Sequence, residues 1–329
     1  MRFRSIAVVT LLSFGAMGSA QAQTGGRAAH PSCTGVAGDA CQQAVDFFHY
    51  MAPQLGTAMT GGNTTMGQGG SMGGPRFGFI PRFSIGVRAN AVFGSVPNFD
   101  PTIGLPGDPT PAAREMTTES MYVPLPAVDL ALGVFKGLPL ALSNVGGVDL
   151  LLSAAYVPEY EGDEVTITPD KSFEFGYGLR VGLLQESLIV PGVGVSYMVR
   201  KFPITTLSTM QGSATLSVQD LDLQSNAWRL TASKSLLLFG ISAGVGQDTY
   251  KASTSVTATQ NSVAVGPVAL DSKVTRTNYF GEVSMNLMLL KIIGSIGMVS
   301  GGDITTYNTY DTPADKSRMY GSVGVRIGL

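Results

Sequence analysis

The sequence is poor in charge, histidine and cysteine, and beyond its N-terminal region it lacks long apolar runs. Lysine and arginine number 21 and aspartate and glutamate 23, so charged residues make up only 13% of the 329 residues. This near balance, without a basic run, argues against nucleic acid as a partner. The mean hydropathy of +0.21 is high for a soluble protein, yet no stretch offers the roughly 18 continuous apolar residues of a spanning helix. Alternating membrane strands produce such a composition.

Residues 1–22 have the layout of an export signal. Arg2 and Arg4 precede a short apolar stretch at 6–16, and Ala20-Gln21-Ala22 is a small-x-small cleavage site. We therefore expect the mature chain to begin at Gln23. The residue directly after the cleavage site is not a cysteine, so we expect no lipid anchor.

Cysteine occurs twice, as Cys33 and Cys41 in the exported part of the chain. An even number at close spacing in an oxidising compartment favours one small disulfide. The alternative is a pair of free thiols in a mobile segment. With His30 as the only nearby further ligand, we expect no metal site.

The clearest structural pattern runs from Arg82 to Phe93 and reads RFSIGVRANAVF. Its odd positions are apolar, and its even positions are polar or small except for Val92. This period of two predicts a strand with one apolar and one polar face. Nine further segments repeat it, and they lie near 128–134, 148–156, 173–183, 192–200, 228–233, 239–246, 278–287, 292–299 and 322–329. The ninth segment, at 292–299, is apolar on both faces and its phase stays open.

The connections between these segments alternate between short and long. The even-numbered gaps are short, whereas the odd-numbered gaps, such as 201–225 and 251–275, are long and polar. Short periplasmic turns, long outer loops and an even strand number are typical of bacterial transmembrane barrels. We therefore predict an all-β fold: a single antiparallel up-and-down transmembrane β-barrel at 79–329 with about 10 strands, or 12 if two segments are merged. On this topology the N-terminal segment and the end of the C-terminal strand both lie on the periplasmic side. Alternation continues into two of the long loops, which predicts strands that extend past the membrane.

Residues 23–78 differ from the barrel and form a separate N-terminal segment. We expect a short helix with Asp39 as its cap and Pro53 as its end. The following stretch at 55–75 is rich in glycine, threonine and methionine and carries no charge. It is either a flexible linker or a plug, meaning a segment that folds back and fills the barrel lumen. The candidate plug residues are Thr60, Asn63, Thr64, Thr65 and Gln68.

Charged residues on the predicted strands fall on the polar, lumen-facing side. They are Arg82, Arg88, Asp129, Asp149, Glu174, Arg180, Arg200, Arg229, Glu282 and Arg326. An arginine facing lipid at the midplane costs about 2–4 kcal/mol, so these groups must face water or one another. They form either a salt-bridge network that fills a narrow barrel or a weakly anion-favouring pore lining. We favour the network, because ten strands are expected to enclose little space.

Glycine repeatedly takes inward positions, among them Gly133, Gly178, Gly194 and Gly244. A barrel filled by its own side chains would need bulk there. Glycine leaves room for water, for a ligand or for the N-terminal segment. Alternatively, it relieves strand curvature and tight packing.

With these features the chain resembles the Gram-negative outer-membrane β-barrel class. Its C-terminal YGSVGVRIGL, Tyr320–Leu329, is similar to a barrel-assembly signal, although it ends in Leu329 rather than an aromatic residue. A fainter likeness, carried by the helical, glycine-rich N-terminal segment, is to FadL-type hydrophobic-compound channels. A TGGNTT-like segment, Thr60–Thr65, is similar to exported barrels of no known function. The resemblance implies the Gram-negative outer membrane as location. It also implies membrane lipid, lipopolysaccharide and the barrel-assembly machinery as partners.

We expect no enzyme and no cofactor, because His30 and His49 both precede the first strand and no Ser-His or Asp-His pair can form in the barrel wall. We expect His49 to lie on the helix surface. The favoured function is porin-like passive transport of small solutes or hydrophobic compounds, gated by the N-terminal segment, with a small hydrophobic ligand as a further partner. The alternative is a structural or interaction barrel with a closed lumen that acts through its long outer loops.

Overall fold

A computed structural model of the chain describes residues 26–74, 81–98, 113–140, 143–162, 165–211 and 214–328. The predicted signal peptide at 1–22, Pro75 at the end of the stretch predicted as linker or plug, and the C-terminal Leu329 lie outside this part of the chain. In the described part, no helix is both long and apolar enough to cross a membrane.

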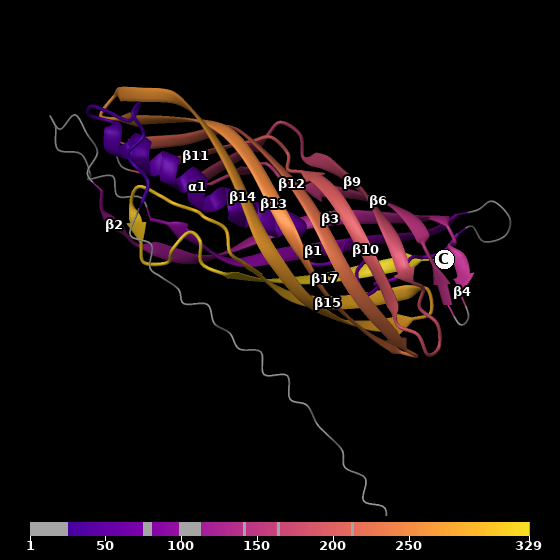
Figure 1. Ribbon diagram of the computed structural model, residues 1–329. Helices are drawn as coiled ribbons and strands as arrows, with labels where there is room; N and C mark the ends of the chain where they lie inside the picture. Colours follow the sequence, from indigo (N-terminus) through magenta and orange to yellow (C-terminus); the bar gives the residue numbers. More distant parts are fainter. Residues whose placement is uncertain are drawn as a thin grey trace, which may run out of the picture.

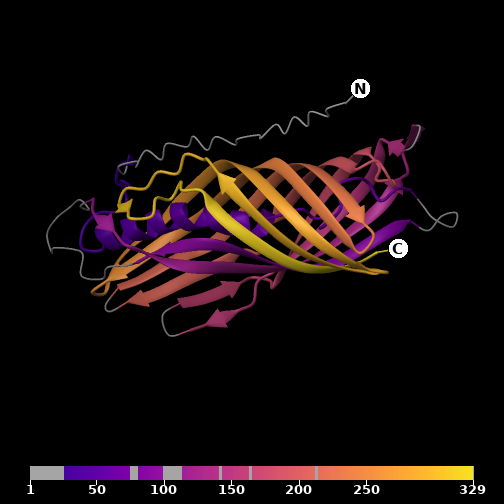
Figure 2. The same ribbon diagram turned by 90° about the horizontal axis from the view of Figure 1, so that it is seen from below.

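Antiparallel strands close into one barrel around the N-terminal helix (Figures 1 and 2). In ring order they are β1 (Arg82–Pro97), β3 (Thr118–Phe135), β6 (Gly147–Tyr156), β9 (Phe173–Leu184), β10 (Gly192–Lys201), β12 (Ala214–Leu236), β13 (Phe239–Gln260), β14 (Val263–Leu287), β15 (Leu290–Ser300) and β17 (Arg318–Gly328). The pairings of β10 with β12 and of β17 with β1 complete the ring. The prediction of ten strands is confirmed, and every predicted segment lies within one of them, except that Leu329 at the end of the last segment lies outside the described residues.

The outer face of the barrel carries the apolar half of each alternating strand. Phe175 on β9 and Val283 on β14, for example, are 70% and 66% exposed. Outward aromatic rings pair across neighbouring strands: Phe93 with Tyr122 and Tyr156 with Phe173 pack with ring centroids 5.4 and 4.8 Å apart, and Tyr197 lies opposite Trp228. An apolar band with flanking aromatic residues is the outer face of a membrane-spanning barrel.

Beyond the aromatic residues, towards the long loops, the two faces of β13 and β14 exchange polarity, so that polar side chains point outward and apolar side chains point inward. Lys251 and Asp271 now face outward, whereas Val256 and Leu270 are buried inside. The two strands continue to a tight hairpin at Asn261 and Ser262, both with positive φ as a two-residue hairpin of this kind requires. The predicted extension of the strands beyond the membrane is present, and this end of the barrel encloses an apolar interior.

Smaller elements complete the two ends. At the long-loop end, β11 (Thr205–Gln211), β8 (Val165–Pro169) and β7 (Tyr160–Glu161) extend the sheet beyond β12, and β2 (Glu115–Met116) pairs with β16 (Thr309–Tyr310). At the turn end, β4 (Leu138–Leu140) and β5 (Ser143–Val145) form a hairpin. The phase of the ninth ring strand, β15, is now clear, because Ile293 and Val299 are buried while Ile296 faces outward.

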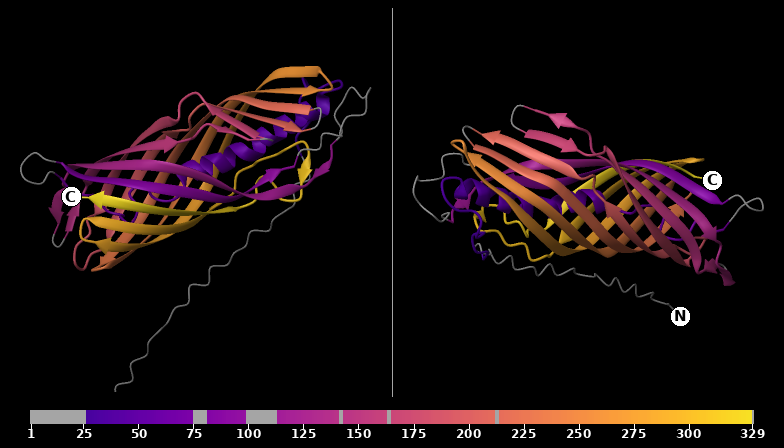
Figure 3. Two further views of the ribbon diagram at one scale, coloured as in Figure 1. Left: turned by 180° about the vertical axis from the view of Figure 1, so that it is seen from behind. Right: turned by 90° about the horizontal axis from the view of Figure 1, so that it is seen from above.

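Helix α1 (Gly38–Thr60) runs along the inside of the barrel and contacts β1, β3, β12, β13, β14 and β17 (Figures 1 and 3). Three expectations for it are wrong. Its N-cap is Ala37, with no side-chain cap, and Asp39 lies in the first turn, 3.6 Å from Arg114. Pro53 lies inside the helix, because packing on all sides outweighs the roughly 3 kcal/mol that an interior proline costs. His49 is buried rather than at a surface.

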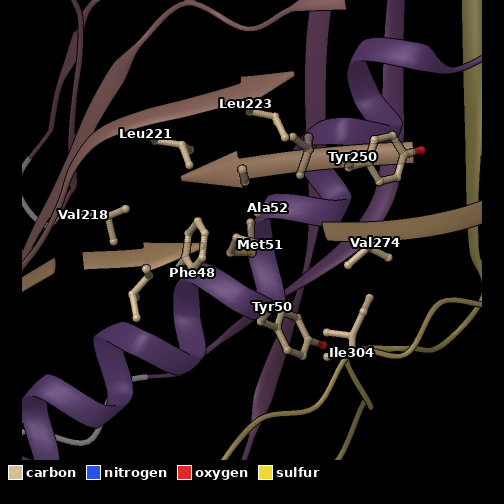
Figure 4. Packing of buried hydrophobic residues seen from close by; sticks show 14 of the residues in the cluster. Phe48, Tyr50, Met51, Ala52, Val218, Leu221, Leu223, Tyr250, Val274 and Ile304 are labelled. Atoms are coloured by element: carbon tan, nitrogen blue, oxygen red, sulfur yellow. The ribbon is translucent and has the colours of Figure 1, made fainter. Parts of the chain in front are cut away.

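The apolar half of α1 packs into the long-loop end of the barrel. Phe48, Met51 and Ala52 belong to one buried apolar cluster with Val218, Leu221, Leu223 and Val274 from the surrounding strands (Figure 4). The expectation that ten strands enclose little space is therefore wrong for this barrel, which holds a complete helix where its inward side chains are small or medium-sized.

The chain enters the lumen at the long-loop end, opposite to the predicted periplasmic start. Asp46 near the start of α1 binds the β15–β17 connection at Asn308, whereas Gly74 lies against Lys136 at the turn end. The chain then begins β1 from that turn end (Figure 3). We call residues 38–74 the plug. The strand topology is as predicted, with β1 starting at the turn end. The predicted periplasmic start of the N-terminal segment is wrong, because this segment starts at the long-loop end.

Candidate functional site

The inward charges of the barrel wall form buried ion pairs. Arg88 lies 2.6 Å from Asp129, Arg180 lies 2.7 Å from Asp149, and Arg229 lies 2.5 Å from Asp248. All six side chains are nearly inaccessible to solvent. A buried pair of this kind needs further hydrogen bonds to offset its desolvation. The plug supplies them.

The C-terminal end of α1 is capped by the wall. Arg229 donates to the Thr60 carbonyl at 3.1 Å and Arg88 donates to the Gly61 carbonyl at 2.8 Å. Asn90 donates to the carbonyl of Ala58 at 2.9 Å. The last carbonyls of a helix have no partner within it and carry partial negative charge. Two guanidinium groups at this end therefore hold the helix in position as well as pairing with acids.

The extended half of the plug, residues 61–74, is held through its backbone by the same face of the wall. Carboxylates accept its amides: Glu282 from Gly67 at 2.7 Å and Asp149 from Met72 at 3.1 Å. Cations bind its carbonyls: Lys291 donates to Gly67 at 3.2 Å and Arg82 to Met72 at 2.9 Å. A segment without regular structure thus has its backbone polar groups satisfied by wall side chains.

The candidate plug residues all lie inside the barrel. Thr60 donates to Asp248 at 3.1 Å, and Thr64 accepts from Arg200 at 2.5 Å. Thr65 accepts from Arg180, and the Gln68 side chain accepts from Arg326 at 3.1 Å. Asn63 makes a local turn instead, donating to the carbonyls of Thr65 and Gln68. Of the two readings of this stretch, the structure has the plug and not the linker.

The inward glycines serve both purposes that the sequence left open. A Cβ on Gly133 would lie 2.0 Å from the Gly73 carbonyl oxygen, and one on Gly194 would lie 2.4 Å from that of Gly69. These two positions make room for the plug backbone. A Cβ on Gly178 would instead meet the Tyr197 carbonyl oxygen at 2.1 Å within the wall itself.

One predicted lumenal charge lies apart from the plug. Glu174 is half-exposed near the long loops, with Lys171 3.9 Å away. The other nine contact the plug, pair with a wall residue or do both. Of the two readings of the charged set, the structure therefore has the network, which here also anchors the plug.

Sequence reasoning missed Asp248, the centre of the polar site. Its carboxylate accepts from Arg229, Thr60, Tyr250 at 3.2 Å and Asn278 at 3.0 Å. The period-two pattern of β13 continues from Gly246 to Asp248 and would have placed it inward. Lys291 was missed because the predicted strand began at 292 and left it in the short turn before, whereas β15 begins at Leu290.

The long-loop end is closed by the β15–β17 connection docked on α1. The Asp46 carboxylate accepts the backbone amides of Tyr307 and Asn308, each at 2.9 Å. The Tyr50 hydroxyl donates to the Thr312 carbonyl at 2.8 Å. Burial raises the pKa of Asp46 to about 6 although these donors lower it, and burial lowers the pKa of His49 to about 3.

Nearer the N-terminus, Cys33 and Cys41 form a disulfide with Cα atoms 5.3 Å apart, which ties the segment before α1 to the first turn of the helix. In the part of the chain that the structure describes, no three histidine, cysteine, aspartate or glutamate side chains gather as a metal site.

No family model matches this chain, and no curated protein matches it. Solved structures similar to it are outer-membrane barrels. The TodX deltaS2S3 mutant monoaromatic hydrocarbon channel is 10% identical over 76% of this chain and 67% of its own, with a TM-score of 0.28. OmpT of Vibrio cholerae is 10% identical over 76% and 97%, with a TM-score of 0.21, and a Rhodopseudomonas blastica porin triple mutant is 9% identical over 76% and 100%, with a TM-score of 0.18. TM-scores this low carry no argument about function.

Proposed function

We propose that this protein is an outer-membrane transport barrel for small solutes whose lumen is closed at rest by the plug. The observation that carries the proposal is how residues 61–74 are held. Wall side chains bind their backbone, and inward glycines leave space for them. In the part of the chain that the structure describes, no wall strand pairs with them. A wall meant only to be solid would be filled by its own side chains. Here, removal of the extended segment leaves a polar passage at the turn end.

The plug divides into two parts that are held differently. Helix α1 is fixed by the apolar interior of the long-loop end, whereas residues 61–74 are fixed chiefly by hydrogen bonds. In water these bonds exchange at a small net cost, since each contributes only about 0.5–1.5 kcal/mol, or about 1.5–3 when a charged group takes part. We therefore place the movable gate in residues 61–74 and expect passage to require a shift of α1 as well.

A second candidate function is a permanently closed barrel that acts through its outer end. The docking of the β15–β17 connection on α1 by Asp46 and Tyr50 favours it, because this contact seals the long-loop end. The two candidates differ in whether the plug moves in the working protein.

A covalent tether tests whether the plug moves. A Cβ on Gly147 would lie 3.0 Å from the Ser71 Cβ, close to the 3.5–4.5 Å of a disulfide, so the variant Ser71→Cys/Gly147→Cys should cross-link with a small backbone shift. We expect single-channel steps from the purified wild-type barrel in a planar bilayer and none from the oxidised double variant. Reduction of the same double variant is the matched control and should restore the steps, and the single variant Ser71→Cys should conduct like the wild type.

Deletion of Gly38–Gly74 distinguishes the two candidates further. If the wild type is silent while a folded, heat-modifiable deletion variant conducts, the plug is permanent and the second candidate is supported. If wild type and oxidised tether conduct equally, the plug is not the gate and the proposal fails.

A further inference from the structure

A cavity of about 290 Å³ opens at the turn end of the barrel, between the end of the plug and the wall. Three cationic side chains line it: Arg82 on β1, Lys291 on β15 and Arg326 on β17. Each donates one hydrogen bond to the plug, at Met72, Gly67 and Gln68 respectively. An arginine has five N–H donors and a lysine three, so donors of all three side chains remain for another acceptor.

Among the residues that the structure describes, none of those lining the cavity is an acid that could match these cations. Two carboxylates close enough to interact with these cations, Glu186 and Glu282, lie outside this lining and form hydrogen bonds with other groups. Glu186 accepts from the Ser235 amide and from the Ser233 hydroxyl, and Glu282 accepts from the Gly67 amide and from Ser242. Other polar lining residues are neutral: Gln68, Ser84, Ser235 and Asn286. The cavity is therefore a cationic pocket that suits an anion.

One side of the cavity is apolar and continues onto an exposed rim. Met72, Met288, Leu289 and Leu290 line it, and Met288 is fully exposed. The rim extends over the neighbouring short turns, where Leu188 and Leu237 are 94% and 96% exposed. Exposed apolar side chains in such number mark contact with a membrane or another apolar surface.

Backbone carbonyls in the turns of this rim have hydrogen-bond partners, as contact with lipid requires. Lys234 donates to the carbonyls of Ser187 at 2.7 Å and Leu188 at 2.8 Å, so its ammonium folds back onto the turn. Asn286 donates to the Leu237 carbonyl at 3.1 Å, and its own amide donates to that of Leu238 at 2.7 Å. In contact with lipid a backbone carbonyl without a partner is strongly unfavourable, whereas in water a water molecule binds it. The turns of this rim are therefore suited to contact with lipid.

From these observations we infer that the cavity binds the headgroup of an anionic phospholipid. The phosphate is held by Arg82, Lys291 and Arg326, and the acyl chains lie along Met288 and Leu289 towards the rim. Guanidinium groups bind phosphate oxygens in pairs and lysine binds them as a point charge. The site borders residues 61–74 and shares its cations with the contacts that hold them, but binding there does not depend on the proposed transport function.

The test is binding of a short-chain phospholipid to the full-length barrel in zwitterionic micelles, measured by calorimetry. The probe is dihexanoyl phosphatidic acid, compared with dihexanoyl phosphatidylcholine and inorganic phosphate. We expect the phosphatidic acid to bind most tightly of the three. Equal affinity for phosphatidylcholine would overturn the role of the cations, and equal affinity for inorganic phosphate would make this a free-phosphate site and overturn the lipid assignment.

A substitution in the lining locates the binding. Ser235→Asp adds a carboxylate among the lining residues without touching the plug anchors, and we expect its Kd for phosphatidic acid to rise at least about tenfold from charge repulsion. Ser235→Asn, neutral at the same position, and Ser253→Asp, exposed at the far end of the barrel, should bind like the wild type. An unchanged Kd in a folded Ser235→Asp barrel would overturn the assignment to this cavity.

Discussion

Asp248 accepts hydrogen bonds from four side chains of the polar site, more partners than any single residue predicted from the sequence has there. Substitution to alanine would leave the buried Arg229 guanidinium unpaired and take an acceptor from Thr60, Tyr250 and Asn278. Loss of one partner of a buried pair costs about 3–5 kcal/mol. We expect Asp248→Ala to lose about that much in free energy of unfolding, followed by the fluorescence of Trp228, the only tryptophan.

The matched control for this prediction is Asp271→Ala, since Asp271 is exposed on the outer face of β14. A surface change of this kind should stay within about 0.5 kcal/mol of the wild type. If Asp248→Ala unfolded as late as the control, the ion pair would contribute nothing beyond what water replaces.

Asp46 gives the barrel a pH dependence whose sign follows from burial. Its pKa is raised from 3.8 to about 6, so the folded state favours the protonated carboxyl. The penalty for burying the carboxylate is absent below pH 4 and complete above pH 6, where it reaches about 3 kcal/mol. The test is the free energy of unfolding of the wild type minus that of Asp46→Asn. We expect this difference to fall by about that amount from pH 4 to pH 7.

Subtraction of the variant is needed because His49 acts in the opposite direction. Burial, with Arg27 and His30 nearby, lowers its pKa to about 3, so its contribution to stability is lost as the pH falls below about 6.5. That contribution is the same in both proteins and cancels in the difference. Parallel pH profiles for wild type and Asp46→Asn would contradict the prediction.

At this scale the sequence was informative wherever the period of two was unbroken. Arg180 and Asp149 were placed inward by parity alone, and they now pair. Parity does not reveal which wall residue meets which plug atom, because the plug has no period of its own. Asp46 lies outside any strand pattern, and its role becomes visible only when the β15–β17 connection docks on it through Asn308.

Among the elements, the contact between the plug and the wall depends on glycines that face the lumen. A Cβ on Gly194 would lie 2.4 Å from the Gly69 carbonyl oxygen, whereas one on Gly281 would have open space. We expect Gly194→Ala to displace residues 69–73 and so raise the rate of amide hydrogen exchange there, including Met72, whose amide Asp149 holds. Gly281→Ala is the control and should leave exchange unchanged. Equal protection in both variants would mean that the wall can move instead.

The helix shows where local signals fail. The expected helix is present, but Asp39 and Pro53 gave wrong ends for it. Both are signals of helices in water, where propensity and caps decide the boundaries. Inside the barrel, apolar contacts around the whole circumference of α1 replace them. A single sequence does not contain that environment until the strands are assembled.

For the whole molecule, the strand number was predictable because membrane strands share one period of alternation. The length of the connection predicted at 251–275 was not, because β13 and β14 extend through it to a two-residue hairpin. The course of the N-terminal segment was not, since strand topology constrains where β1 begins but not how the preceding chain reaches it. The plug begins at the long-loop end and descends to the start of β1, with Asp46 bound to Asn308 at one end and Gly74 against Lys136 at the other.

This course predicts which side of the membrane displays the residues before α1. If the short turns are periplasmic, an epitope inserted between Gly26 and Arg27 will bind antibody on intact cells. An epitope in the β13–β14 hairpin, between Asn261 and Ser262, should bind on the same side, because that hairpin lies at the long-loop end. One between Leu237 and Leu238, in a short turn, should bind only after permeabilisation. Should the Gly26 and Asn261 epitopes be found on opposite sides, the chain would not be threaded through its own barrel as described.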